Sequence, residues 1–425
     1  MEIKKFILLS ITVLLGGLAL TACSNDEEEV ADDTTPVINM LPKSRSVTLT
    51  NEQRQFVEKN NDFAFNLYRA IRQSGNKSTI VSPISVTYLM GMLNDGAWGQ
   101  TSKEITTMLG FGEGDKNAVN EYCKTLIEQV PLIDESVILK IANIIAVNKN
   151  VELEPDYQKD MKQYYEAETT SIDFSNSTSI DYLNNWCKEH TEGLIPQIIE
   201  SLDPSSLLVL MNAIYFQATW PEKFDPKDTR QESFTKADGS EQKIQMMHRT
   251  ARCAFAMNDV YSTLCLPYGN GDKWSMMVLL PNEGKTTDDI IKNLSNTSWD
   301  ENWANRQSVE VDIKIPRFST RSDITLNDAI NSLGAPSIFR PHDADFSLIT
   351  KNCKESFAVS LIKQKAAIEV TEEGTKASAV TIADANGSSG YNFEKVNFHA
   401  NHPFVYLIRE HSTGIVFFIG TYMGD

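Results

Sequence analysis

The stretch that decides the fold reads Glu372-Glu373-Gly374-Thr375-Lys376-Ala377-Ser378-Ala379-Val380-Thr381 and lies about fifty residues from the C-terminus. Two carboxylates and a glycine lead into a run of small residues. The side chains of a strand alternate between its two faces. On one face of this segment all side chains are small, namely Thr375, Ala377, Ala379, Thr381, Ala383 and Ala385. On the other face lie the charged and larger side chains, Lys376, Ser378, Val380, Ile382, Asp384 and Asn386.

The residues that follow, Asn386-Gly387-Ser388-Ser389-Gly390, have the composition of an exposed turn. A segment that is patterned for tight packing as a strand but leads into an exposed turn favours a conformational switch. An ordinary surface loop is the alternative, because alanine, serine and threonine are also common in loops. The choice between the two depends on the remainder of the chain.

The N-terminus resembles a lipoprotein export signal. Lys4 and Lys5 precede an apolar run over residues 6–20, which is shorter than the roughly 20 residues of a membrane span. The ending Leu20-Thr21-Ala22-Cys23 resembles the bacterial lipoprotein box. We therefore predict a lipoprotein signal peptide over residues 1–22 and lipid attachment at Cys23. An ordinary secretory signal with an incidental cysteine is the alternative.

An acidic segment follows directly. It contains the run Asp26-Glu27-Glu28-Glu29 and has no apolar periodicity, so we predict an acidic flexible tether over residues 23–47. The acidic run resembles the stretch that sends lipoproteins of some Gram-negative anaerobes to the outer face of the outer membrane. We expect the protein to be held in the outer membrane by its N-terminal lipid, with the folded part facing the cell exterior.

The composition narrows the class of protein. The formal net charge of −18 disfavours nucleic-acid binding, which requires a basic surface. Besides Cys23 there are five widely spaced cysteines without a CxxC pair, which we interpret as buried small side chains rather than as a disulfide framework or a zinc site. The sequence contains no GxSxG, HExxH or GxxxxGK(S/T) motif. We expect no metal, no cofactor and no enzymatic activity, and a monomer.

Residues 48–425 are predicted to form one large α+β domain, because helices and strands interleave and no linker divides them. Apolar periodicity predicts helices over residues 51–73, from Ser82-Pro83 onward, and over residues 101–109, where Thr101 and Glu104 would form a capping box. Apolar runs predict strands over residues 138–147, 207–216, 276–280, 309–315, 366–370, 404–409 and 415–420. The strand 207–216 is the most apolar, so we expect it to be central and covered on both faces, with Asn212 as a buried polar group.

A series of short motifs along this body resembles the serpin family. Each motif is weak alone, but their order over more than 300 residues is specific. In chain order they are Asn76, Val81-Ser82-Pro83-Ile84-Ser85, Gly96-Ala97-Trp98-Gly99-Gln100-Thr101, Ala142-Asn143, Trp186, Thr191-Glu192-Gly193-Leu194-Ile195, Asn212-Ala213-Ile214-Tyr215-Phe216, Trp220, Met246-Met247, Pro316-Arg317-Phe318, Leu333-Gly334, Ala344-Asp345-Phe346-Ser347, the stretch 372–381, and His402-Pro403-Phe404.

The resemblance implies a fold and an activity. The expected fold has a large central mixed β-sheet, two smaller sheets, eight or nine helices and an exposed reactive-centre loop. The expected partner is a serine or cysteine endopeptidase that cuts the loop and is trapped as an acyl-enzyme while the cut loop inserts as a new central strand. Overpacking costs roughly 1–3 kcal/mol per misfit, which accounts for a uniformly small inserting face. The implied loop hinge consists of Glu373, Gly374, Thr375, Lys376, Ala377, Ser378, Ala379, Val380 and Thr381.

The resemblance also implies a sheet-opening region. Ser82, Ser85 and Asn212 match a polar cluster beneath the opening sheet, and Trp220 matches the tryptophan where the loop first enters. The family usually completes the cluster with a histidine, where this chain has Gln364. Glutamine can donate and accept hydrogen bonds but cannot gain charge, so we expect no pH-dependent opening through this residue.

The bond that a protease would cut is predicted in two ways. Counting fourteen residues from Gly374 gives the bond Ser388-Ser389, whereas counting backwards from Pro403 gives a position near Tyr391. We prefer the forward count, because the length of the inserted segment determines how far the protease is carried. Ser388 suits an elastase-like or subtilisin-like enzyme with a small pocket, and Tyr391 suits a chymotrypsin-like one.

Two other functions compete with inhibition. A serpin that does not inhibit would act as a cell-surface binding or scaffold protein. Such members often carry bulky or charged residues, or proline, on the inserting face, and this face has none. A surface hydrolase would need a nucleophile, a base and an orienting group, and no such set is visible in the sequence.

Overall fold

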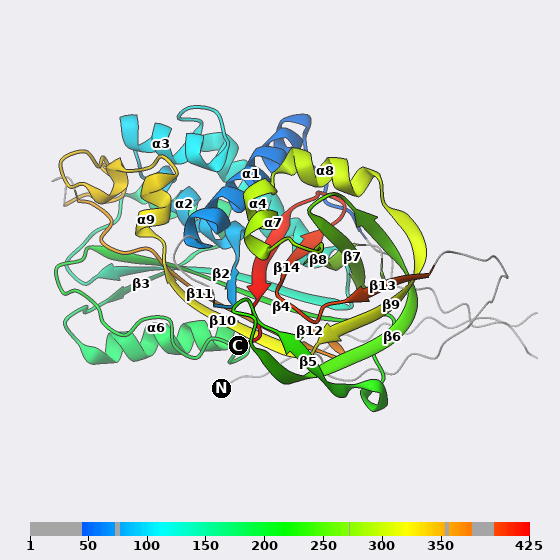
Figure 1. Ribbon diagram of the computed structural model, residues 1–425. Coiled ribbons are helices and arrows are strands. Elements are labelled where there is room, and N and C mark those ends of the chain that lie inside the picture. Colours follow the sequence, from blue (N-terminus) through cyan, green and yellow to red (C-terminus); the bar gives the residue numbers. More distant parts are fainter. Residues whose placement is uncertain (1–44, 73–76, 272, 353–356, 376–394) are drawn as a thin grey trace, which may run out of the picture. The chain divides into compact units, whose positions relative to one another are not determined.

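The computed structural model describes residues 45–72, 77–271, 273–352, 357–375 and 395–425 (Figure 1). Several residues singled out in the sequence lie outside these ranges. They are Cys23 with the rest of residues 1–44, the hinge residues from Lys376 to Thr381, and the predicted cut sites Ser388, Ser389 and Tyr391.

The described residues form nine α-helices, within the expected eight or nine. They are α1 (Asn51–Arg72), α2 (Pro83–Asp95), α3 (Gly99–Leu109), α4 (Lys116–Gln129), α5 (Pro155–Tyr165), α6 (Ser177–His190), α7 (Thr287–Asn293), α8 (Asn296–Ala304) and α9 (Asn327–Ser332). Short 3-10 helices cover η1 (Val130–Leu132), η2 (Pro226–Asp228) and η3 (Ser337–Phe339). Over the described ranges, no helix combines the length and apolarity needed to cross a bilayer.

The start of α2 is as predicted. The Ser82 hydroxyl accepts a hydrogen bond from the backbone N–H of Ser85, and Pro83 occupies the first turn. A serine cap satisfies one of the free N–H groups of the first turn, and proline is tolerated there because it has no N–H to leave unpaired. Gly96 ends the helix.

The predicted capping box of α3 is wrong. The helix begins two residues earlier, at Gly99, and has no side-chain cap. The Thr101 hydroxyl instead accepts from the backbone N–H of Asp345 (3.0 Å), and the Glu104 carboxylate accepts from that of Ser337 (2.9 Å). Both side chains therefore tie α3 to a distant segment, because tertiary partners compete successfully with a local cap.

The strands form two sheets. The six-stranded sheet has the order β10 (Phe318–Thr325), β11 (Lys363–Thr371), β12 (Gly374–Thr375), β4 (Leu208–Thr219), β2 (Val137–Asn148) and β3 (Glu168–Ile172). The nine-stranded sheet has the order β1 (Thr79–Val81), β15 (Val416–Tyr422), β14 (Phe404–Glu410), β8 (Trp274–Pro281), β7 (Tyr261–Tyr268), β6 (Glu241–Met257), β9 (Gln307–Pro316) and β13 (Lys395–His399), with β5 (Arg230–Thr235) also beside β6. Both sheets are mixed, because β2 with β3 and β9 with β13 are parallel pairs.

The two smaller sheets expected beside the central one are continuous with each other. Strand β6 is 17 residues long and belongs to both. It pairs with β5 and β9 along most of its length and with β7 over residues 255–257. A strand of this length crosses from one group of strands to the other without a break, and so the architecture has two sheets among the described residues.

Strand β4 confirms the strand predicted over residues 207–216, but not the expectation that it is covered along its whole length. Met211 and Ala213 pack against α6 on one face, while Ile214 and Phe216 join the main core on the other. The first half of the strand is only partly buried, and Asn212 is half-buried rather than buried. Among the described strands, this first half of β4 is paired along one edge only, by β2, as described below.

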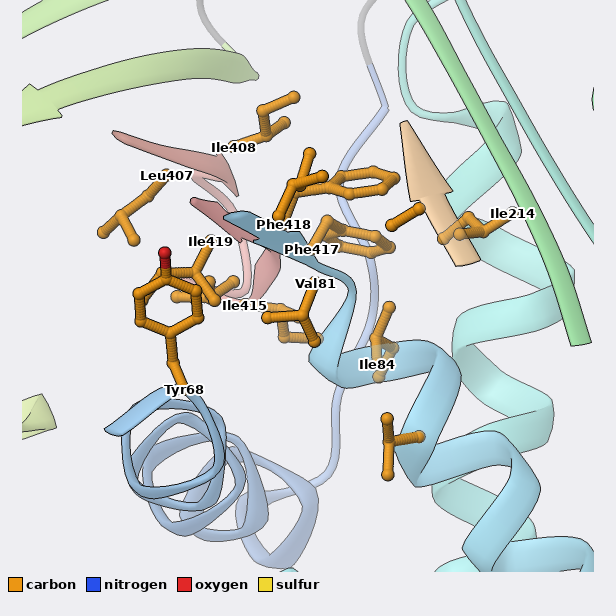
Figure 2. Packing of buried hydrophobic residues seen from close by; sticks show 14 of the residues in the cluster. Tyr68, Val81, Ile84, Ile214, Leu407, Ile408, Ile415, Phe417, Phe418 and Ile419 are labelled. Atoms are coloured by element: carbon orange, nitrogen blue, oxygen red, sulfur yellow. The ribbon is translucent and has the colours of Figure 1, made fainter. Parts of the chain in front are cut away.

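The main core lies around the C-terminal strands (Figure 2). Every residue of β15 is buried, as are all but one of β14. Figure 2 shows Phe417 and Phe418 of β15 close to Val81 of β1 and Ile84 of α2, with Tyr68 of α1 nearby. The end of the chain thus closes the core that the first helices begin.

The cysteines within the described ranges behave as interpreted from the sequence. Cys123, Cys187, Cys253 and Cys265 are buried and free of disulfides. Burial raises the pKa of the Cys253 and Cys265 thiols to about 11, so they stay protonated and act as small apolar side chains.

Candidate functional site

The hinge predicted from the sequence begins inside the six-stranded sheet. Gly374 and Thr375 form β12, which lies between β11 and β4 and pairs antiparallel with both. Thr375 lies opposite Val370 of β11 and Ala218 of β4. The first two residues of the predicted inserting segment thus already occupy a central strand position.

Gly374 has a conformation that only glycine accommodates here. Its φ is 140°, in the region that L side chains rarely adopt. A Cβ atom at this position would lie 2.2 Å from the backbone oxygen of Ala218. The glycine lets the chain turn into the sheet while its backbone stays in close contact with β4.

Thr375 enters a socket of aromatic side chains and is only 2% exposed. Its hydroxyl shares a hydrogen bond of 2.5 Å with the Tyr268 hydroxyl. The Tyr268 ring stacks on Trp220, with centroids 4.3 Å apart and planes at 11°. Trp220 in turn donates from its indole N–H to the carbonyl of Thr371 (3.0 Å) and from its backbone N–H to that of Glu373 (2.9 Å). The structure therefore places Trp220 beside the start of β12.

Two ion pairs hold the chain just before the socket. The Glu372 side chain is buried and accepts from both nitrogens of the Arg317 fork, at 3.0 and 2.6 Å, and from the Thr229 hydroxyl at 2.6 Å. Burial raises the pKa of the Glu372 carboxyl, but the hydrogen bonds from Arg317 and Thr229 lower it, and the net shift is downward. Glu373 forms the second pair, with Lys223 at 2.5 Å.

Beyond β12 the two flanking strands do not pair with each other. Strand β11 pairs with β10 over residues 363–370 and with β12 only at its last two residues. Strand β4 pairs with β2 over residues 208–218 and with β12 only at residues 218 and 219. Within the described ranges, no register joins β11 to β4. Each strand therefore has an inner edge of backbone N–H and C=O groups without a ladder partner from that part of the chain, and unpaired edges of this kind favour the addition of a strand.

Three of the four predicted residues of the polar cluster meet beneath these edges. Gln364 of β11 accepts from the backbone N–H of Ser82 and donates to its carbonyl, both at 2.9 Å. The Ser85 hydroxyl donates to the Ser82 hydroxyl (3.1 Å). The glutamine thus satisfies both backbone groups of one residue, as a neutral side chain with a donor and an acceptor can.

Asn212 does not join this cluster. Its amide nitrogen donates to the side chain of Asn143 across the β2–β4 pair (2.9 Å). Its side-chain oxygen is buried and accepts no hydrogen bond from any described residue. A buried acceptor without a donor costs free energy. A hydrogen-bond donor placed beside the inner edge of β4 would therefore stabilise this oxygen.

Sequence reasoning missed several residues of the site, namely Tyr268, Thr229 and Lys223, and the role of Arg317 as the partner of Glu372. Tyr268 ends a continuously apolar strand, Leu264-Cys265-Leu266-Pro267-Tyr268, which indicates burial but not a hydroxyl aimed at another strand. A charged pair across 55 residues of sequence leaves no local signal. Among the described residues, no group of three or more His, Cys, Asp or Glu side chains is arranged to hold a metal ion.

Comparison with known proteins agrees with this geometry. The model of the family described as Serpin (serine protease inhibitor) matches residues 58–424. Human neuroserpin is 31% identical over 378 residues, which cover 85% of this chain and 90% of neuroserpin. The native structure of the thermophilic serpin tengpin superimposes with a TM-score of 0.81 at 27% identity, over 90% of this chain and 97% of tengpin. Thyroxine-binding globulin in complex with thyroxine gives a TM-score of 0.77 at 27% identity, over 87% of this chain and 98% of the globulin. The chain belongs to the serpin family.

Proposed function

We propose that this serpin is an irreversible suicide-substrate inhibitor of serine endopeptidases, with cysteine endopeptidases as a second target class. In this proposal a protease cuts the loop after β12 and remains attached as an acyl-enzyme. The cut loop then inserts between β11 and β4 and carries the protease with it. The observation that carries the proposal is the position of β12, which starts an additional strand between two inner edges.

Extending the register of β12 shows what the inserted strand would meet. Thr375 lies opposite Ala218, so in an antiparallel pair Ala377 would lie opposite Phe216 and Ala379 opposite Ile214. Phe216 and Ile214 belong to the main core, and directly opposed residues share a face of the sheet. The small face of the loop would therefore be the one turned to the core, where bulky side chains would be overpacked.

The same extension accounts for the separated polar groups. Thr381 would lie opposite Asn212 on β4 and opposite Gln364 on β11. The Thr381 hydroxyl would then supply a donor to the unpartnered Asn212 oxygen. We propose that insertion completes the polar cluster, so that uncut protein pays the cost of an unsatisfied acceptor and inserted protein does not.

The free energy for trapping would come from the strand itself. Two edges would each gain several backbone hydrogen bonds, worth roughly 1 kcal/mol apiece, and a row of small side chains would be buried. The total is on the order of 10 kcal/mol. This is large enough to pull on a covalently attached protease. The role proposed for the chain is that of a consumed substrate, not of an enzyme.

A binding protein without inhibitory activity is the competing function, and the structural relative solved with bound thyroxine shows that a serpin can carry a small molecule. Inhibition is favoured here because the inserting face has no bulky, charged or proline residue from Thr375 to Ala385.

The test is to mix the full-length protein with pancreatic elastase, chymotrypsin, subtilisin and papain in turn, and to analyse each mixture on a denaturing gel. Inhibition predicts a covalent complex that survives denaturation, and a released C-terminal peptide whose mass identifies the cut. A peptide that starts at Ser389 supports the forward count, and one that starts after Tyr391 supports the other. Cleavage by all four enzymes without a complex, and without a rise in the melting temperature of the cut protein, would rule out trapping by insertion.

We also propose that the protein is anchored by a lipid at Cys23 in the outer membrane and faces the exterior. This proposal rests on the sequence Leu20-Thr21-Ala22-Cys23 and the acidic run after it. Replacing Cys23 by serine is expected to abolish labelling by a radioactive fatty acid. Protease added to intact cells should remove the folded part; protection of the protein until the outer membrane is permeabilised would place it on the inner side.

A further inference from the structure

Strand β13 is the edge strand at which the chain re-enters the fold after the loop. It has five residues and pairs in parallel with β9 only, among the described strands. Phe398 anchors it on the buried face and is 1% exposed. On the opposite face, its last residue, His399, reaches across to β9. A short parallel edge strand is weakly held by its ladder, so side-chain contacts on this face have a large share in retaining it.

The outer face of the sheet carries a carboxylate between two imidazoles. His248 of β6, Asp312 of β9 and His399 of β13 lie on three adjacent strands. The Nε2 atom of His248 is 2.7 Å from one carboxylate oxygen of Asp312, and the Nε2 atom of His399 is 2.9 Å from the other. Hydrogen bonds from His248 and His399 lower the pKa of Asp312 to about 2. The carboxylate is therefore ionised throughout the physiological range.

Other charged groups share this face of the sheet, as the strand registers show. They are Arg252 on β6, Glu310 and Lys314 on β9, Lys395 on β13, and Arg230 and Glu232 on β5. Lys314 lies opposite both histidines in the register, but its charge is paired with Glu232, at 2.8 and 3.0 Å. The two imidazoles contact Asp312 directly, whereas the other charges are spread over both signs and are screened by solvent. The contact with Asp312 therefore sets the sign of the effect of protonation.

We propose that His248, Asp312 and His399 form an acid-tightened clasp that holds β13 on the edge of the sheet. A neutral imidazole donates one ordinary hydrogen bond to the carboxylate. A protonated imidazole donates a charge-assisted bond, which is roughly twice as strong. Histidine is the side chain that ordinarily changes charge between pH 5 and 8. Mild acid thus strengthens the hold on β13, and alkaline pH weakens it.

The consequence for the loop rests on the function proposed above. If an uncut loop were laid along β4 as far as Leu208, the register would use residues up to Ala385 and leave residues 386–394 to reach β13. The ten Cα–Cα steps from Ala385 to Lys395 span at most about 33–36 Å, and the inserted strand itself would be about 33 Å long. Full insertion of an uncut loop would therefore stretch this connection to its limit and pull β13 away from β9. The clasp opposes this self-inactivation, and does so most strongly in acid.

Hydrogen exchange tests the clasp without any protease. The full-length protein is compared at about pH 5.5 and pH 8, with each amide rate divided by its intrinsic rate at that pH. We expect amides of β13 to exchange about fivefold slower in acid, while amides of β14, which is paired on both sides, show no such difference. Exchange of β13 that is equal at both pH values, or faster in acid, would overturn the proposal.

Variants separate charge from structure. His399→Gln keeps a hydrogen-bond donor but cannot be protonated, so the acid effect on β13 should shrink to less than about twofold while protection at pH 8 is retained. His342→Gln, at an exposed turn, is the matched control and should keep the full effect. Asp312→Asn should lose it as well; unchanged protection of β14 verifies that each variant is folded. An undiminished acid effect in His399→Gln would assign the effect to another group.

A second measurement distinguishes failure of the clasp from failure of the proposed function. The protein is incubated near its growth temperature at both pH values, and the fraction that still forms a covalent protease complex is followed with time. Slower loss in acid, abolished in His399→Gln, is expected. If no protease is ever trapped, the inhibitory function fails while the exchange result stands. If trapping occurs but its loss is independent of pH and of His399, the link between clasp and loop is wrong.

Discussion

Strands β14 and β4 both lie inside a sheet, but they are held in opposite ways. Strand β14 is paired along its length on both sides, by β8 and β15, and nearly all of its residues are buried. Within the part of the chain that the structure describes, β4 is paired on one side by β2 and on the other only by the two residues of β12. The first strand belongs to a frame of strands paired on both sides, β8, β14 and β15. The second borders the accepting region, the position between β11 and β4 where we propose that the loop inserts.

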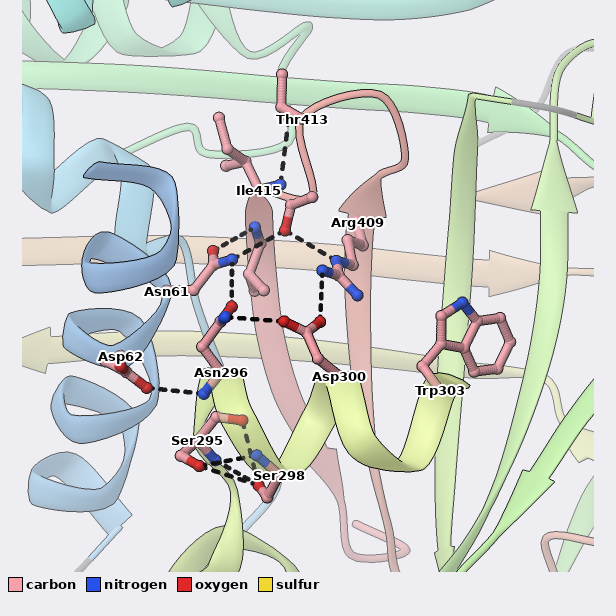
Figure 3. A network of polar contacts seen from close by, with 12 residues as sticks. Asn61, Asp62, Ser295, Asn296, Ser298, Asp300, Trp303, Arg409, Thr413 and Ile415 are labelled. Carbon is pink, nitrogen blue, oxygen red and sulfur yellow. Dashed lines mark hydrogen bonds and ion pairs between the residues drawn. The ribbon is translucent and has the colours of Figure 1, made fainter. Parts of the chain in front are cut away.

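The frame is reinforced by polar contacts as well as by its core (Figure 3). Asn61 of α1 donates to Asn296 of α8 and to the carbonyl of Gly414, and accepts from the backbone N–H of Val416. Figure 3 shows the network continuing through Asp300 to Arg409 on β14. Both atoms of the Asn61 amide are hydrogen-bonded in this network, whereas the Asn212 oxygen beside the inner edge of β4 accepts no hydrogen bond from the described residues.

The largest effect is expected from a charge placed in the accepting region between β11 and β4. Thr375→Arg places a charge in a socket that leaves Thr375 2% exposed, and an uncompensated buried charge costs about 3–5 kcal/mol. We expect no covalent complex, normal cleavage as a substrate, and no rise in melting temperature after cleavage. Denaturing gels and calorimetry measure these outcomes.

The control for this variant is Glu369→Arg, at an exposed position of β11 in the same sheet. It should form complexes in normal yield. Trapping by Thr375→Arg with unchanged yield would show that β12 is not the point at which insertion begins.

The next largest effect is expected when a hydrogen-bonding side chain next to the frame is removed. Asn61→Leu leaves three buried polar groups without their partner, at a cost of about 3 kcal/mol in the free energy of unfolding. The melting temperature of uncut and cut protein should fall together, while the yield of complex stays normal. Asn66→Leu, at an exposed position of the same helix, should be nearly neutral. A loss of complex formation in Asn61→Leu would contradict the separation of frame and accepting region.

A smaller effect is expected from the ion pair between Glu372 and Arg317, just before β12. Glu372→Gln removes the charged partner of Arg317 and should cost about 2 kcal/mol. Because the pKa of Glu372 is lowered in the folded state, its stabilisation is present above the pKa of the unfolded chain and is lost as pH falls through the folded value. The stability gap between wild type and variant should therefore be constant from neutral pH to about pH 5 and close in stronger acid.

Denaturant unfolding across this pH range measures the gap, with Glu369→Gln as the exposed control. A gap that persists unchanged in strong acid would show that Glu372 acts through packing and not through its charge.

The smallest effect concerns Thr381. Thr381→Val keeps the shape and removes the hydroxyl proposed to satisfy Asn212 after insertion. We expect the cleaved protein to lose about 1 kcal/mol, with the uncut protein unchanged. The double variant with Asn212→Ala should lose no more than the single Asn212→Ala variant in the cleaved form. Additive losses in this cycle would place the two side chains apart.

The difference between β14 and β4 also explains which parts of the fold the sequence could predict. The strands 404–409 and 415–420 were predictable because a frame strand is continuously apolar. Of the predicted hinge, Gly374 and Thr375 lie in β12, where alternating small residues favoured a strand over an ordinary loop; the hinge residues from Lys376 onward lie outside the described residues. The half-buried start of β4 was not, since its apolar side chains are the same whether or not a neighbour is present. The same holds for Tyr268 and Arg317, whose partners are remote in sequence and are fixed by the packing of the sheets.

The position of β14 and β15 has a consequence for the order in which the protein is made. These two strands separate β8 from β1 in the nine-stranded sheet, yet they are synthesised after every other described strand. Until residue 422 has emerged, both flanking strands expose unpaired edges and α1 and α2 lack the apolar surface that they cover in the finished molecule. The nine-stranded sheet therefore cannot close before β14 and β15 have been made. A stop codon within residues 404–422 is expected to be as damaging as one far upstream.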